Sequence, residues 1–327
     1  MIKVEITTSD LRKAVDALKD FLEGKLICVI GPSSSGKSLF SKLLAESLNG
    51  TVLSTDDFYL SEAWRLASVL STFDHPSLID WDLLIKTVKD SLEGKEVEVP
   101  IYDMRISSRI GYRKLKPKPP IVLEGIFASY GPLNELCDQK VAIDSPIHLL
   151  MARRMIRDPQ RALEAPSKIL DRVVRTVLPF SKTFVEPQMR EAKLKVVNVW
   201  RPQLPYELKE CERGEALKGY DERRVFVASY GEDRVYMIEN IVDSLVEHYV
   251  LVSWENKYIG ARVLPDTAYF ALTALAAHGF KVKGYYQRGK WDEAMKGEVM
   301  EEVTWKKIGS EKCCKLCVPR EEIYREG

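Results

Sequence analysis

A chain of 327 residues is too long for one small domain, and we expect two domains of ordinary size. The 49 basic and 48 acidic side chains leave a net charge of +1, which excludes a global attraction to nucleic acid or to an anionic membrane. No apolar run is long enough to span a membrane, and the N-terminus has no signal-peptide pattern. We therefore expect a cytoplasmic protein with neither nucleic acid nor membrane as a partner.

The first 200 residues alternate short apolar strands with helices. A strand over 2–6 precedes a helix for which Ser9 is the expected N-cap, and a second apolar strand covers 26–30. This alternation predicts an α/β fold with a parallel sheet covered on both faces. Further strands are expected at 51–54, 121–123 and 141–143, and helices at 81–92, 149–157, 167–177 and 183–194.

The character of the sequence changes near residue 196, and residues 201–205, Arg-Pro-Gln-Leu-Pro, resemble a linker. Beyond it, β-rich segments surround one clear helix at 267–278, which predicts a smaller α+β domain. The expected domains are therefore 1–200 and 201–327. The strands of the second are expected at 225–230, 249–254, 280–287 and 299–305.

Residues 31–38, Gly-Pro-Ser-Ser-Ser-Gly-Lys-Ser, fit the phosphate-binding loop pattern directly after the second strand. The backbone N–H groups of such a loop and the N-terminus of the next helix converge on phosphate. We predict that the loop binds ATP, that Lys37 neutralises the β- and γ-phosphates, and that the Ser38 hydroxyl binds Mg²⁺. The alternative is a chance glycine-serine turn. The expected nucleotide contacts are Gly31, Ser33, Ser34, Ser35, Gly36, Lys37, Ser38 and Leu39.

Two acidic positions follow apolar strands, at the edge where parallel strands end. Asp56 lies in the segment 54–59, Ser-Thr-Asp-Asp-Phe-Tyr, and Glu124 ends the strand at 121–124. We predict that Asp56 is the general base toward an acceptor hydroxyl, and that Glu124, Ser38 and Asp56 serve the metal. The alternative is that Asp56 or Asp57 only caps a helix.

Four arginines, Arg153, Arg154, Arg157 and Arg161, lie within three helical turns. The last three share one helix face, and guanidinium groups suit phosphate. The alternative is a solvated helix whose arginines pair with the acidic residues at 158 and 164.

Three of the six cysteines lie close together near the C-terminus. Their C-x-x-C spacing would suit half of a zinc site, but no second ligand pair accompanies it. The alternative is reduced thiols near a chain end, because a disulfide is unfavourable in a reducing compartment. The clustered residues are Cys313, Cys314 and Cys317, and the scattered ones are Cys28, Cys137 and Cys211.

Six motifs in one order resemble the uridine kinase and phosphoribulokinase family of P-loop kinases, over about residues 25–200. The resemblance implies an ATP- and Mg²⁺-dependent phosphotransferase with an alcohol acceptor on a small molecule. It implies that Asp74 grips sugar hydroxyls, that Tyr59, Phe73 and Tyr102 line the acceptor site, and that Arg154, Arg157 and Arg161 belong to a lid over the phosphates, where Arg157 contributes to catalysis. The motifs are 31–38, 54–59, 73–76 with 80–82, 97–103, 124–128 and 153–158.

Two positions depart from the uridine-cytidine kinases. Ser107 stands where those enzymes carry the histidine that reads the base, and Arg172 stands where a glutamine is expected in the helix after the lid. The residues expected to transfer the phosphoryl group are all present. Because Ser107 replaces the base-reading histidine, however, the sequence does not identify the acceptor.

A further resemblance concerns the whole chain. Residues 107–113, 184–187 and 192–198 resemble the uridine kinase-like half of fusion proteins whose other half is a CYTH, or triphosphate tunnel, domain. Residues 262–284 are weakly similar to the late part of that domain, but no E-x-E-x-K metal strand is evident. We therefore expect a degenerate CYTH-like domain that is a regulatory, ligand-binding or dimerising module, which leaves a homo-oligomer open.

Two other functions remain alternatives for the chain. One is a nucleotide or polyphosphate hydrolase of the pyrophosphatase type, in which water replaces the acceptor. The other is a non-catalytic ATP sensor whose first half switches the second.

Overall fold

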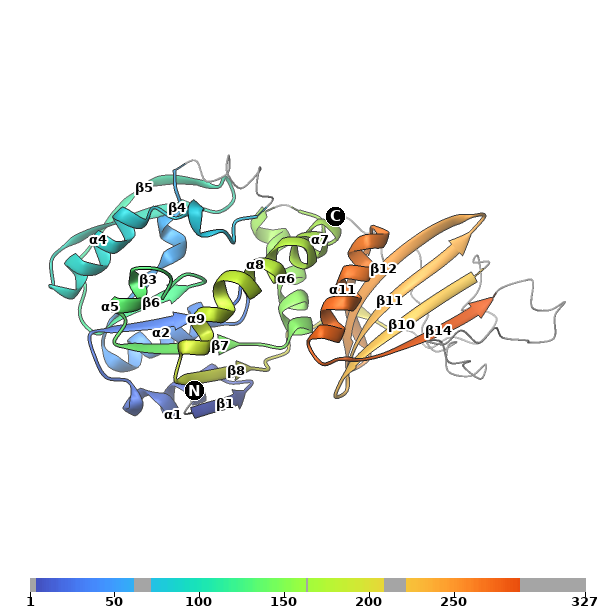
Figure 1. Cartoon of the computed structure of the whole chain (residues 1–327), viewed down its shortest axis with the longest axis horizontal. Coiled ribbons are helices and arrows are strands. Elements are labelled where there is room, and N and C mark those ends of the chain that lie inside the picture. Colours follow the sequence, from blue (N-terminus) through green and yellow to red (C-terminus); the bar gives the residue numbers. More distant parts are fainter. Residues whose placement is uncertain (1–3, 62–71, 163, 209–221, 289–327) are drawn as a thin grey trace. The chain divides into compact units, whose positions relative to one another are not determined.

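The computed structural model of the chain describes residues 4–61, 72–162, 164–208 and 222–288 (Figure 1). The chain divides into two compact units, Met1–Leu150 with Thr176–Arg201, and Met151–Arg175 with Pro202–Gly327. The division after Arg201 falls at the expected linker. The segment Met151–Arg175, which was expected in the first domain, groups instead with the second unit.

The first unit contains a six-stranded sheet in the order β1-β8-β7-β2-β6-β3, in which every neighbouring pair is parallel. The predicted α/β fold with a parallel sheet is confirmed. The central strands β2 and β6 are buried along their whole length, because helices cover both faces of the sheet. The strands are β1 Val4–Thr8, β2 Leu26–Ile30, β3 Thr51–Ser54, β6 Ile121–Gly125, β7 Gln139–Asp144 and β8 Leu194–Asn198.

Alternate residues of β2 enter two different cores. Ile27 and Val29 pack with α1 and α2, whereas Leu26, Cys28 and Ile30 pack on the other face with α4 and α9. The α helices of this unit are α1 Leu11–Leu18, α2 Lys37–Leu48, α4 Trp81–Leu92, α5 Leu133–Leu136, α8 Leu178–Phe180 and α9 Glu186–Glu191. Short 3-10 turns are η1 Lys19–Phe21, η2 Thr55–Phe58 and η3 Pro76–Leu78, and η4 Val173–Val177 and η5 Ser181–Val185 are π-helical.

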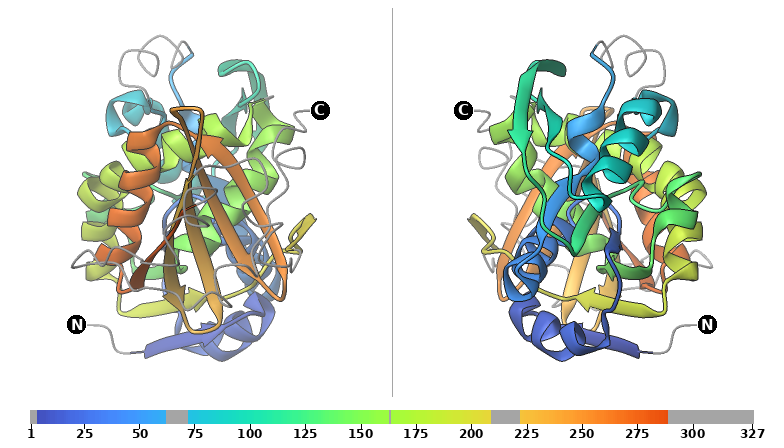
Figure 2. Two further views of the ribbon diagram at one scale, coloured as in Figure 1. Left: turned by 90° about the vertical axis from the view of Figure 1, so that its right-hand side faces the viewer. Right: turned by 90° about the vertical axis from the view of Figure 1, so that its left-hand side faces the viewer.

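A two-stranded ribbon, β4 Val97–Asp103 and β5 Ser108–Leu115, lies outside the main sheet (Figures 1 and 2). Among the strands that the structure describes, these two pair only with each other, in antiparallel register. Tyr102 lies directly opposite Arg109 across the ribbon, so the two side chains share a face.

Two local predictions differ from the structure. The N-cap of α1 is Asp10 and not Ser9, because the Asp10 carboxylate accepts a hydrogen bond of 2.9 Å from the backbone N–H of Arg12. The helix expected over 183–194 ends at Glu191, and Leu194 begins β8. The burial of β8 alternates because Leu194 and Val196 face the core formed with α1 and α2, whereas Lys195 and Val197 point to the other face of the sheet.

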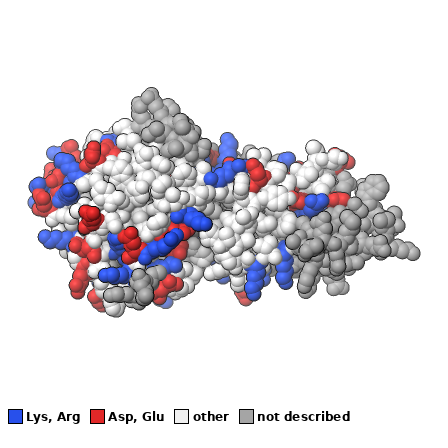
Figure 3. Space-filling view, viewed as in Figure 1, with Lys and Arg blue, Asp and Glu red and all other residues white. Residues whose placement is uncertain are grey.

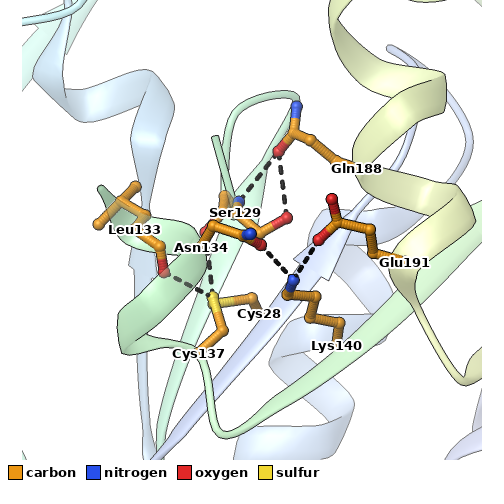
Figure 4. A network of polar contacts seen from close by, with 9 residues as sticks. Cys28, Ser129, Leu133, Asn134, Cys137, Lys140, Gln188 and Glu191 are labelled. Atoms are coloured by element: carbon orange, nitrogen blue, oxygen red, sulfur yellow. Dashed lines mark hydrogen bonds and ion pairs between the residues drawn. A yellow bond between two sulfur atoms is a disulfide. The ribbon is translucent and has the colours of Figure 1, made fainter. Parts of the chain in front are cut away.

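A disulfide joins Cys28 of β2 to Cys137, which precedes β7 (Figure 4). The two Cα atoms lie 5.8 Å apart, although 109 positions separate the residues in the sequence. Sequence spacing gave no sign of this pair. The cluster Cys313, Cys314 and Cys317 and the strand expected at 299–305 lie outside the described residues.

Gln188 of α9 connects the helix to the segment that follows β6 (Figure 4). Its Oε1 accepts a hydrogen bond of 3.0 Å from the Ser129 backbone N–H, and its Nε2 donates to the carbonyl oxygens of Ile126, at 2.9 Å, and Phe184, at 2.6 Å. Because Gln188 is buried, water cannot replace it at these backbone groups.

The second unit contains an antiparallel sheet in the order β14-β10-β11-β12-β13-β9. The helix α11 packs against it, in agreement with the predicted α+β architecture, although β9, β11 and β13 were not predicted. The strands are β9 Tyr206–Glu207, β10 Glu222–Tyr230, β11 Asp233–Val242, β12 Leu245–Trp254, β13 Lys257–Val263 and β14 Lys281–Arg288, and the helices are α6 Ile147–Ala162, which begins in the first unit, α7 Pro166–Arg172 and α11 Pro265–Ala277.

Within the second unit, α7 is joined to the first turn of α11. The Thr267 hydroxyl donates to the Asp171 carboxylate at 2.5 Å, and Arg175 pairs with both Asp171 and Asp266. The Arg175 guanidinium also lies over the ring of Phe270, 5.4 Å from its centroid. These contacts explain why residues 151–175 group with the C-terminal sheet.

Charges of both signs are interspersed on the face drawn in Figure 3. Among the residues coloured there, neither Lys and Arg nor Asp and Glu gather into one large patch. On this face, a charged ligand would therefore be attracted by a few side chains at its own site and not by one large charged patch.

Replacing Gln188 by alanine should lower the free energy of unfolding by about 1–3 kcal/mol, because it leaves buried backbone groups without partners. Urea denaturation followed by circular dichroism measures the change. The matched control is Gln203→Ala, which removes the same side chain from an exposed position and should change little. Equal effects of the two substitutions would contradict this role of Gln188.

Candidate active site

The phosphate-binding loop connects β2 to α2, and two of its glycines are sterically required. A Cβ on Gly31 would lie 2.1 Å from the Ile143 carbonyl oxygen. Gly36 has a φ of +102°, in the left-handed region, and a Cβ there would lie 2.6 Å from Nδ2 of Asn198. That Nδ2 donates to the Ser35 carbonyl oxygen at 2.8 Å, so the end of β8 supports the loop.

Glu124 lies at the end of β6, beside the first turn of α2. Its Oε1 accepts hydrogen bonds from the hydroxyl groups of Ser38, at 3.1 Å, and Ser54, at 2.8 Å. The register of β3 with β6 pairs Ser54 directly with Glu124, which explains the second contact. The structure thus brings the predicted Ser38 and Glu124 together, and adds Ser54, which sequence reasoning did not select.

The carboxyl group of Glu124 is almost completely buried. Its side chain is only 5% exposed, and burial raises the pKa of its carboxyl, with nearby Lys37 opposing the shift and Asp56 adding to it. Lys37 is itself buried, at the start of α2. A buried acid and a buried base therefore lie next to each other at the phosphate-binding loop.

The arrangement fits a magnesium ion. Oε2 of Glu124 is buried and has no hydrogen-bond partner among the described residues, so one carboxylate oxygen is left for a cation. Hydroxyl and carboxylate oxygens are the ligands that Mg²⁺ prefers, and in kinases it also binds substrate phosphates. Within the described ranges, no group of three or more His, Cys, Asp or Glu side chains forms a metal cage. The ion would be held by Glu124 and Ser38 together with nucleotide oxygens.

The two adjacent acids after β3 differ in their contacts. The Asp57 carboxylate forms an ion pair of 2.9 Å with Arg113 of β5, and burial raises its pKa against the opposing effect of that arginine. Asp56 lies close enough to affect the ionisation of both Asp57 and Glu124. Of these two acids, Asp56 is therefore the one that lies near Glu124.

Three aromatic side chains expected in the acceptor site lie together. The Tyr59 ring is 5.9 Å from that of Phe73 and 5.3 Å from that of Tyr102, centroid to centroid. The Tyr59 hydroxyl also donates to the Phe73 carbonyl oxygen at 2.9 Å. Asp74 follows directly, and its backbone N–H donates to the Thr72 hydroxyl at 3.0 Å. Burial raises the pKa of Tyr102 to about 12, so its hydroxyl stays protonated at neutral pH.

The predicted lid arginines lie on α6, and two of them, Arg154 and Arg157, pair with Asp158 of the same helix. Nε of Arg154 lies 3.0 Å from the Asp158 carboxylate, and Nη2 of Arg157 lies 2.7 Å from it. Arg172 pairs with Glu164. The two pairs with Asp158 agree with the alternative interpretation, although Arg154 and Asp158 are buried and not solvated, and Glu164 pairs with Arg172 instead of an arginine of α6. The side chain of Arg161 lies outside the described residues. The role of these arginines at a phosphate stays a prediction.

The sheet, the loop and the Glu124 carboxylate define a P-loop phosphotransferase fold. The chain belongs to the phosphoribulokinase / uridine kinase family, whose sequence pattern matches residues 26–203.

Comparison with known proteins finds similar chains in two groups. The "Inorganic pyrophosphatase TTM2" of Arabidopsis thaliana is 37% identical over 179 residues, which are 54% of this chain and 26% of that protein. The "Uridine-cytidine kinase C" of Dictyostelium discoideum is 30% identical, over 58% of this chain and 43% of that protein. The "Uridine kinase" of Ligilactobacillus salivarius is 34% identical, over 52% of this chain and 83% of that protein. The matched region thus spans about a quarter of the plant protein's length.

Among the described residues, none of the helices has the length and apolar character needed to cross a membrane.

Replacing Glu124 by glutamine should raise the Mg²⁺ concentration at half-maximal activity by about 10- to 100-fold, the range typical for loss of a group that supports a metal. The substitution keeps the shape of the side chain and removes its charge. Titrating activity with Mg²⁺ at fixed ATP measures the effect, and Glu98→Gln on the exposed side of β4 is the matched control. An unchanged Mg²⁺ requirement would exclude Glu124 from the metal site.

Proposed function

We propose that this chain is an ATP- and Mg²⁺-dependent kinase that transfers the γ-phosphoryl group to a hydroxyl of a small nucleoside-like or sugar acceptor. The observation that carries the proposal is the Glu124 carboxylate, which two serine hydroxyls hold beside the phosphate-binding loop with one oxygen left for a cation. The separate cluster of Tyr59, Phe73 and Tyr102 supports an acceptor site.

Each residue has a defined task in this reaction. The loop N–H groups and Lys37 stabilise charge on the β- and γ-phosphates, while Mg²⁺, when bound, neutralises phosphate charge and aligns the phosphate oxygens. Asp56 orients the acceptor hydroxyl and takes its proton as the oxygen attacks phosphorus in line with the departing ADP. Asp74 positions the acceptor through its hydroxyl groups. Arg154, Arg157 and Arg161 stabilise the phosphates from α6.

The second candidate is a pyrophosphatase-type hydrolase, which the similarity to "Inorganic pyrophosphatase TTM2" and "Inorganic pyrophosphatase TTM1" favours. In that reaction water takes the place of the acceptor hydroxyl. A hydrolase needs no aromatic residues to bind an acceptor, so the ring cluster around Tyr59 supports the kinase.

We also propose that the C-terminal sheet is a degenerate CYTH-like module with a regulatory task. Its support is the antiparallel sheet with one packed helix, and the similarity of 54% of the chain to the TTM proteins. Submicromolar, Mg²⁺-dependent binding of tripolyphosphate to the full chain, unaffected by ATP, would contradict the degenerate assignment.

Replacing Lys37 by alanine should lower phosphoryl transfer by about two to three orders of magnitude, since one preorganised charge at the transferring group contributes roughly 3–4 kcal/mol. Release of ADP in the presence of acceptor measures the rate. Lys42→Ala, at an exposed position of the same helix, should leave the rate unchanged. Wild-type turnover by folded Lys37→Ala protein would mean that the loop is not the active site.

Replacing Asp56 by asparagine should lower acceptor phosphorylation by about 10²- to 10⁴-fold while ATP binding persists, because the amide keeps the size but cannot take a proton. Calorimetry gives the ATP affinity, and a coupled ADP assay gives the transfer rate. Asp82→Asn, on the exposed side of α4, is the control. If Asp56→Asn transferred phosphate at the wild-type rate, another group would have to be the base.

A further inference from the structure

One arginine joins three segments around the aromatic cluster of Tyr59, Phe73 and Tyr102. Arg109 of β5 has a side chain that is 10% exposed. Its Nη2 donates to the Tyr59 carbonyl oxygen at 3.1 Å and to the Asp80 carboxylate at 3.1 Å. Asp80 is the N-cap of α4, where its other carboxylate oxygen accepts from the Leu83 N–H. A single guanidinium therefore connects the ribbon, the segment after η2 and the first turn of α4.

The Arg109 guanidinium has a buried N–H donor left, the one on Nε. Nη1 of Arg109 donates to the Tyr112 hydroxyl at 3.1 Å, but Nε is buried and has no hydrogen-bond partner among the described residues. The hydroxyl of Tyr102, directly opposite on the ribbon, is likewise buried and without a described partner. A buried polar group without a hydrogen-bond partner lowers the stability of the folded protein by about 1–3 kcal/mol. Since two such groups lie side by side on one face of the ribbon, we infer that a ligand binds both.

The nearby serine does not compete for this task. Ser107 has a φ of +51°, in the turn between β4 and β5, and its hydroxyl is directed 3.5 Å toward the Met104 carbonyl oxygen of the same turn. Among the polar side-chain atoms of the ribbon, the buried ones without a described partner are Nε of Arg109 and the hydroxyl of Tyr102.

The charge of Arg109 is already balanced. Its ion pair with Asp80 offsets the positive charge, so the free Nε–H is a directional donor rather than an uncompensated cation. Such a donor suits a neutral oxygen, whereas a phosphate placed here would also approach the Asp80 carboxylate.

We propose that Arg109 is a specificity-determining residue of the acceptor site, which fixes Tyr59 and Asp80 and, with the Tyr102 hydroxyl, binds a neutral carbonyl or hydroxyl oxygen of the acceptor. This inference rests on the proposed kinase function. The acceptor class is a neutral molecule with a hydrogen-bonding oxygen remote from the hydroxyl that is phosphorylated, as opposed to a sugar that already carries a phosphate.

The test uses full-length protein with ATP and Mg²⁺, and uridine and ribose 5-phosphate as neutral and anionic probes. Arg109→Gln should raise the KM for uridine at least 10-fold, with the KM for ATP within twofold of wild type. Arg109→Lys keeps a cation for Asp80 but lacks the Nε–H, and should also raise the KM for uridine. The matched control is Arg105→Gln, at an exposed arginine on the same ribbon, which should leave both values within twofold.

Each outcome bears on the proposal. If Arg109→Lys restored the wild-type KM for uridine, Arg109 would act through its ion pair alone and the donor role would be wrong. If Arg109→Gln matched Arg105→Gln, or if wild-type protein phosphorylated ribose 5-phosphate and not uridine, or neither, the inference would be overturned. The proposed kinase function fails separately, only when no acceptor of a wider panel is phosphorylated.

Discussion

The site depends on the parallel pairing of β6 with both β2 and β3. This pairing brings the phosphate-binding loop, Ser54 and Glu124 to one edge of the sheet, because parallel strands end on the same side. Glu124 is buried there as an acid held by two hydroxyls, next to buried Lys37. A buried carboxylate is costly without partners, and the proposed Mg²⁺ and nucleotide phosphates would supply them at this edge of the sheet.

The parts of this arrangement that sequence could predict are local ones. The loop at 31–38 has a fixed spacing, and the helix predicted at 81–92 matches α4, because a cap and an apolar stripe lie within a few turns. Contacts between distant segments could not be predicted in the same way. Asn198 supports the loop only because β8 joins the sheet, and Ser54 reaches Glu124 only through strand register. The Cys28–Cys137 pair and the contacts of Arg109 also depend on the folded topology.

The arginines along α6 were harder to interpret from the sequence than the acidic residues that follow the parallel strands. The arginines on α6 suggested a phosphate site, yet Arg154 and Arg157 share the Asp158 carboxylate, and sequence alone cannot tell a salt bridge from a ligand contact. The segment 151–175 also contacts α11 through Asp171 and Arg175, which explains its grouping with the C-terminal unit.

The central claim is that the γ-phosphoryl group of ATP passes to an acceptor hydroxyl. Phosphorus NMR of wild-type protein with ATP, Mg²⁺ and a panel of nucleosides, sugars, pentose phosphates and inorganic polyphosphates tests it directly. The expected product is a phosphate ester of one organic acceptor, formed in the same amount as ADP. Conversion of ATP or polyphosphate to inorganic phosphate alone, at a rate independent of every acceptor, would contradict it.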